Sequence, residues 1–142
     1  MSYTQKMENK EYPHLTVGFC YDKDYGIYCE ITGIGLYSDP LLTIPDTIHG
    51  YKVRSIADGA FENRFVGSTI IIPNGVIYIG KAALDHATIC FDGTREQWLA
   101  IDKGSDWAGH SYYTITIRCT DGNEIFENMA AVITKPTFTP VS

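Results

Sequence analysis

The sequence of 142 residues predicts a short, mainly β solenoid, in which small units stack and share one core. The first observation behind this prediction is an internal repeat. "LLTIPDTIHGYKVRSIADGAF", residues 41–61, returns in shortened form as "TIIIPNGVIYIGKAAL", residues 69–84. The second is that each copy holds one very short alternating run before an Ile-Pro step. Units this small cannot bury their apolar side chains alone, so we expect them to stack.

Each copy of the repeat begins as a strand and continues as a compact coil. Proline ends the strand because it has no backbone N–H to donate to a ladder. Asp58-Gly59 then permits a tight turn with positive φ. Apolar residues recur at matching places in both copies. We expect one continuous core made of Ile44, Val53, Ile56, Phe61, Ile72, Val76, Ile79 and Leu84.

The chain before the repeat divides into an arm and a hairpin. Residues 1–13 are polar and aperiodic, which predicts a flexible N-terminal arm. Beyond them, "LTVGFCY" and "GIYCEITGI" alternate on either side of "DKDYG", which predicts a β-hairpin cap. Folding about Asp24 and Tyr25 sets Cys20 opposite Cys29. A cross-strand disulfide and two reduced cysteines are both open, and reduced cysteines are favoured because nothing marks an oxidising compartment.

The chain after the repeat carries the pattern of a second cap. A third, incomplete strand copy, "TICFDG", precedes "TREQWLAIDKG". There Thr94 with Gln97 forms a capping-box pattern, which predicts a short amphipathic helix. The alternating "TITIRC" predicts a last strand that ends at "TDG". We therefore place the repeat domain with its caps at residues 14–122 and a C-terminal extension at residues 123–142.

Composition and motifs narrow the classes of function. A net charge of -6 without clustered Lys or Arg argues against nucleic-acid binding. No apolar run approaches the roughly 20 residues that span a bilayer, and the first fifteen residues lack the apolar core of a signal peptide. Cysteines and histidines show no metal-ligand spacing, and no nucleophile elbow or phosphate loop occurs. We expect a non-catalytic protein that uses no metal or cofactor.

"LTIPDTIHGYKVRSIADGAF" followed by "IIIPNGVIYIGKAAL" resembles the BspA-like subfamily of leucine-rich repeats, whose units run strand, Ile-Pro, Val, Ile, small residue, Ala-Phe. "FDGTREQWLAIDKGSDW" with "TIRCTDG" resembles the terminal piece of such arrays. The resemblance spans about residues 19–122 and departs from the pattern at Leu84, where phenylalanine is usual. It implies a leucine-rich-repeat solenoid with a non-catalytic adhesion or protein-interaction role at an extracellular surface. The alternative is a structural part of a larger assembly, such as a phage virion's fibre, baseplate or capsid decoration.

Aromatic side chains near the end of the domain are candidate partner-binding residues. Trp107, Tyr112 and Tyr113 fall in the loop "GSDWAGHSYY". Such rings stack on sugars or anchor protein partners, so the partner is a protein or glycan surface. The alternative is that these rings complete the small core and its cap.

The C-terminal extension contains a second candidate partner-binding segment. Met129, Val132 and Ile133 belong to an apolar, strand-competent run, and the prolines beyond it favour an extended chain. We expect this run to dock on the sheet edge of a partner or of a neighbouring subunit. Pairing with this chain's own sheet is the alternative.

Overall fold

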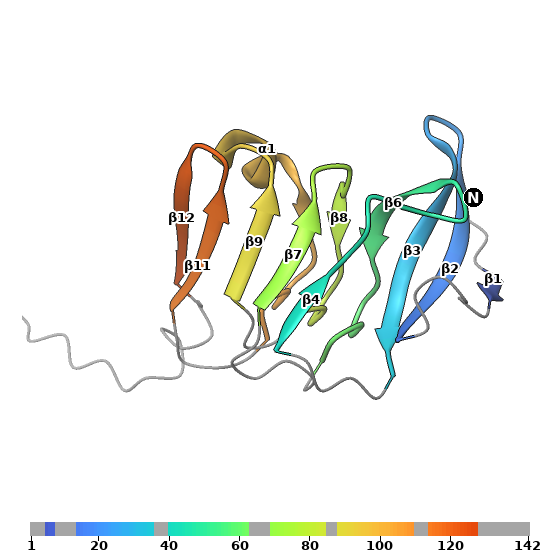
Figure 1. The fold of residues 1–142 in the computed structure, drawn as a ribbon, viewed down its shortest axis with the longest axis horizontal. Helices are drawn as coiled ribbons and strands as arrows, with labels where there is room; N and C mark the ends of the chain where they lie inside the picture. The colour runs from blue at the N-terminus through green and yellow to red at the C-terminus, as the bar shows by residue number, and fades with distance from the viewer. Residues whose placement is uncertain are drawn as a thin grey trace, which may run out of the picture.

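The computed structural model describes residues 5–7, 14–35, 40–62, 69–84, 88–109 and 114–127. Two β-sheets lie face to face (Figure 1). Sheet A has the strand order β1 (Gln5–Met7), β2 (Leu15–Asp22), β3 (Gly26–Ile34), β6 (Tyr51–Ile56), β8 (Tyr78–Ile79) and β10 (Asp102–Lys103), with β5 (Thr47–Ile48) paired to β6. Sheet B has the order β12 (Gly122–Glu127), β11 (Thr114–Cys119), β9 (Thr88–Asp92), β7 (Thr69–Pro73) and β4 (Leu41–Thr43). The predicted short, mainly β repeat solenoid is confirmed.

Each turn of the solenoid contributes one strand to each sheet. In sheet B, β4, β7 and β9 run parallel, and in sheet A, β6, β8 and β10 do the same. The same hydrogen bond recurs from turn to turn where the chain leaves sheet A. Gly80 N–H donates to the carbonyl of Ile56, and Gly104 N–H donates to that of Ile79, both at 2.8 Å. Successive turns therefore repeat one backbone geometry.

The third turn is complete, which corrects the expectation of an incomplete third copy. After β9 the chain forms helix α1 (Arg95–Ala100) and then returns to sheet A as β10. Strand register aligns Ile56 with Ile79 and Ile79 with Lys103. The sequence does not reveal this unit readily, because the helix separates its two halves and Lys103 stands where the first two turns have Ile56 and Ile79.

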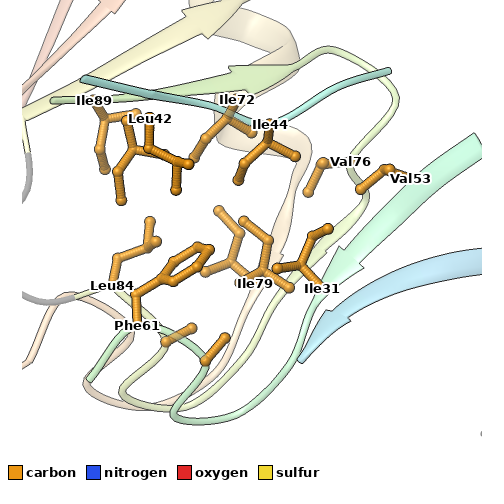
Figure 2. Packing of buried hydrophobic residues seen from close by; sticks show 14 of the residues in the cluster. Ile31, Leu42, Ile44, Val53, Phe61, Ile72, Val76, Ile79, Leu84 and Ile89 are labelled. Carbon is orange, nitrogen blue, oxygen red and sulfur yellow. The ribbon is translucent and has the colours of Figure 1, made fainter. Parts of the chain in front are cut away.

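The core lies between the two sheets and is continuous. Figure 2 shows Leu42, Ile72 and Ile89 from sheet B facing Phe61 and Leu84, which follow the strands of sheet A. All eight predicted core residues belong to this one cluster, so the core prediction is confirmed. The inward residues of β4, β7 and β9 alternate with outward ones, as the two-residue period of a strand requires.

The N-terminal hairpin exists, but its register differs from the expected one. Its loop has three residues rather than two, and Gly26 takes the left-handed conformation with φ 71°. Cys20 is therefore paired with Tyr28, and Phe19 is opposite Cys29. Adjacent strand residues point to opposite faces, so Cys20 and Cys29 do not share a face, and no disulfide joins them.

Both ends of the domain extend beyond the expected boundaries. Strand β1 lies inside the arm expected at residues 1–13 and pairs antiparallel with β2. Strand β12 includes residues 123–127, which pair with β11, so the sheet continues past Gly122. Both corrections have the same cause. Each segment is polar and lacks an alternating strand pattern of its own, and it becomes a strand because it pairs with a neighbouring strand. The remainder of the extension lies outside the described residues.

The C-terminal cap forms as its capping box predicts. Thr94 Oγ1 accepts the N–H of Gln97 at 3.1 Å, while Gln97 Oε1 accepts the N–H of Thr94 at 2.9 Å. Trp98, the buried residue of α1, lies edge-on to Phe91 with ring centroids 5.5 Å apart. The helix therefore covers the end of the core beside the last turn.

Candidate interaction surface

The outward face of sheet B carries regular rows of side chains. Because Ile70, Ile72 and Ile89 point inward, their strand neighbours point outward. Strand register aligns these outward residues across all five strands. The first row is Leu41, Thr69, Thr88, Thr116 and Ile125, and the second is Thr43, Ile71, Cys90, Arg118 and Asn123. We call these two rows the sheet B face.

A shallow hollow of about 390 Å³ opens where strands β4, β7 and β9 end. Proline at the end of β7 and after β4 places a rigid apolar ring where the sheet stops. Two carboxylates, one after β4 and one at the end of β9, stand beside these rings. The residues that line this end hollow are Thr43, Ile44, Pro45, Asp46, Ile71, Pro73, Cys90, Phe91 and Asp92.

The outward face of sheet A carries polar contacts between neighbouring strands instead. Glu30 accepts hydrogen bonds from the hydroxyl of Ser55 and the thiol of Cys20. Burial, with the nearby Cys20 and Glu30, raises the pKa of Tyr28 to about 12. Burial and the neighbouring Asp58 also raise the pKa of Tyr78, whose hydroxyl donates to that carboxylate at 3.3 Å. The bond from Ser55 to Glu30 joins β6 to β3, and the bond from Tyr78 to Asp58 joins β8 to the turn after β6.

A second hollow, of about 180 Å³, lies between α1 and β12. Lys103 Nζ lies 4.7 Å from the centroid of the Trp98 ring and donates to the carbonyls of Trp98 and Ile101 at 2.8 and 3.1 Å. Burial lowers the pKa of this ammonium group. Lys103 thus donates hydrogen bonds to the last carbonyls of α1 and caps the C-terminal end of the helix. Its ammonium group is already bound within the chain.

Exposed aromatic residues gather at the N-terminal end, where Figure 1 shows the β2–β3 hairpin projecting beyond the sheet. Tyr21 and Tyr25 are exposed, and the Tyr51 ring lies 5.3 Å from the Phe19 ring. The guanidinium of Arg54 sits 4.8 Å from the Tyr25 centroid. Site prediction from the sequence missed this cluster. The sequence signal that could have revealed it is the two-residue alternation of the strand. This alternation puts Phe19 and Tyr21 on the same face of β2, near the end of the strand that is less buried.

The candidate residues named from the sequence are only partly placed by the structure. Trp107 is 7% exposed and packs between Trp98 at 5.6 Å and Phe126 at 4.8 Å. It is a core residue of the cap, as the alternative of rings that complete the small core expected, and its role in partner binding stays a prediction. The other candidates lie outside the described residues: Tyr112, Tyr113, Met129, Val132 and Ile133.

The described ranges hold no group of three or more His, Cys, Asp or Glu side chains arranged to bind a metal ion. Within the same ranges, no helix is both long and apolar enough to cross a bilayer. The described strands present aliphatic groups, hydroxyls and a few charges to the solvent.

A solved structure similar to this chain is the crystal structure of a leucine-rich repeat protein from Bacteroides capillosus ATCC 29799. The likeness covers 63% of this chain and 70% of that chain, with 18% sequence identity and a TM-score of 0.41. No family model matches the sequence, and no curated protein matches it. The repeat architecture rests on this chain's own strand register and hydrogen bonds.

Proposed function

We propose that this protein is a non-catalytic protein-interaction module that binds its partner on the sheet B face. The observation that carries the proposal is the pair of outward rows, which run across five strands and meet the end hollow. Stacked repeats present extended, rigid surfaces of this kind to other macromolecules. A rigid face binds with little loss of conformational freedom, because its side chains are already ordered by the strands beneath them.

The composition of the sheet B face favours a protein partner over a glycan. Most of its outward residues are aliphatic side chains and threonines, with Leu41, Ile71 and Ile125 as the largest apolar members. Sugar recognition typically uses aromatic rings as stacking platforms, whereas aliphatic contacts suit the side chains of another protein. Adhesion at an extracellular surface, as in BspA-like leucine-rich repeats, is the finer form of this proposal. A virion part is not proposed, because no contact among the described residues favours it.

The test compares two substitutions that place the same charge on two different parts of the surface. A partner captured from the native source by cross-linking is bound again to purified Ile71→Arg and Ile27→Arg variants. Ile71 lies on the sheet B face, while Ile27 is an exposed residue of the N-terminal hairpin. We expect Ile71→Arg to abolish binding with an unchanged circular dichroism spectrum, and Ile27→Arg to bind normally. The reverse pattern would move the binding surface to the N-terminal hairpin.

A further inference from the structure

We propose that the end hollow receives a lysine or arginine side chain of the bound partner. This inference rests on the proposed function and names the chemistry of the partner at one point of the same face. The hollow combines an apolar floor with negative charge: the charged residues among those that line it are Asp46 and Asp92. A long basic side chain matches this combination, because its stem is aliphatic and its head is a cation.

The two carboxylates differ in what already binds them. Asp46 Oδ2 accepts a hydrogen bond from Lys52 Nζ at 3.0 Å, so its charge is compensated. Asp92 is exposed, and in the part of the chain that the structure describes it makes no side-chain hydrogen bond or ion pair. Asp92 is therefore the carboxylate that a partner's cation would meet.

Strand register places the apolar floor directly beside Asp92. Pro73 is the register partner of Asp92 on the neighbouring strand, and Ile71 and Cys90 are partners one outward position earlier. A side chain entering across β7 would lay its methylene groups on Ile71 and Pro73 and bring its charged end to Asp92. A hollow of about 390 Å³ is large enough for one such side chain together with part of the neighbouring backbone.

Two other charged residues, Arg118 and Asp121, lie near this edge, and Asp121 provides an internal control. Arg118 is the register partner of Cys90 on β11, yet it does not line the hollow and forms no ion pair with Asp92. Asp121 follows the same strand at the same edge of sheet B, but it is bound by Arg95, with Nε and Oδ1 3.9 Å apart. Removing the charge of Asp121 changes the net charge as much as removing that of Asp92, without touching the hollow.

The experiment titrates the full ¹⁵N-labelled chain with two peptides and follows backbone amide shifts by NMR. The probes are acetyl-Gly-Ser-Arg-Ser-Gly-amide and the same peptide with glutamine in place of arginine. We expect shifts that cluster at Ile71, Cys90 and Asp92, and affinity roughly fivefold higher for the arginine peptide at low salt, as one partly exposed ion pair contributes. Asp92→Asn should abolish this preference, while Asp121→Asn should retain it. Added salt should weaken it, since exposed charges are screened.

Three results would overturn the inference: equal affinity for both peptides, a preference that survives Asp92→Asn, or equal losses in Asp92→Asn and Asp121→Asn. The native partner separates this inference from the proposed function. A partner that is released by Ile71→Arg but binds Asp92→Asn with unchanged affinity would leave the sheet B face as the binding surface and reject the basic side chain. Unchanged binding to Ile71→Arg would reject the sheet B face itself.

Discussion

Ala82 occupies in the second turn of the solenoid the position that Gly59 occupies in the first, and both have a left-handed backbone, with φ of 51° and 67°. Asp106 takes the same conformation in the third turn, with φ 51°. The stacking geometry thus imposes one backbone conformation on three different residues. It suits glycine, and it costs an L-residue with a Cβ about 1–2 kcal/mol.

The first prediction follows from this strain. Ala82→Gly should raise the free energy of unfolding by about 0.5–1 kcal/mol, because the relief of strain exceeds the entropy that glycine loses on folding. Urea denaturation measures the change. Ala83→Gly is the matched control: Ala83 is buried and is not among the positive-φ residues, so the same replacement should destabilise by about 1 kcal/mol. Destabilisation by Ala82→Gly would show that the conformation is not strained.

The second prediction concerns Phe61, which is fully buried in the core between the two sheets. Phe61→Ala should lower the free energy of unfolding by roughly 3–5 kcal/mol, since it removes apolar contacts and leaves a cavity. Leu99→Ala, at a residue 64% exposed, should change it by less than about 0.5 kcal/mol. A melting temperature that barely moves in Phe61→Ala would contradict the shared core.

The third prediction addresses the helical cap. Thr94→Ala should cost about 1 kcal/mol because the N–H of Gln97 loses its acceptor, while Thr94→Ser should retain most of the stability. Trp98→Ala should cost roughly 3–5 kcal/mol, as it opens the core between Phe91 and Trp107. Thermal unfolding of the three variants checks the order. Equal and negligible effects would mean that α1 contributes nothing to the end of the solenoid.

The fourth prediction is a loss of stability in alkali that depends on Cys29. Burial, with smaller effects of Cys20 and Glu30, raises the pKa of the Cys29 thiol from its ordinary value of 9.0 to about 12. Above pH 9 the unfolded chain loses this proton while the folded chain keeps it, so stability falls as pH rises toward 12. The slope is at most about 1.4 kcal/mol per pH unit. Urea unfolding between about pH 8 and 10 should show a shallower slope in Cys29→Ala, and equal slopes would refute the assignment.

The fifth prediction concerns the C-terminal extension. Deleting residues 129–142 should leave the melting temperature unchanged and abolish binding of the native partner, because the sequence predicts that residues 129–133 dock as a strand on a partner's sheet edge. Deleting residues 134–142 alone keeps that run and should preserve binding. A large loss of stability with binding intact would instead show that the run pairs with this chain's own sheet.

The sequence by itself determined the features that depend on neighbours along the chain. The strand ends followed from the Ile-Pro steps, and the core positions followed from the two-residue alternation. The start of the helix followed from the Thr94–Gln97 spacing. Each of these signals acts within a few residues of the chain. Phe61 and Leu84 could be assigned to the core because they recur at matching places in two copies of one unit.

Only the tertiary structure decided the features that depend on how separate turns meet. The hairpin register depends on the left-handed backbone of Gly26. The third turn depends on stacking across an inserted helix, and the burial of Trp107 depends on aromatic rings from α1 and β12. The end hollow arises where three strands end side by side, bringing together Pro45, Pro73 and Asp92. No local pattern encodes these contacts, because each one is set by register between residues that are distant in the chain.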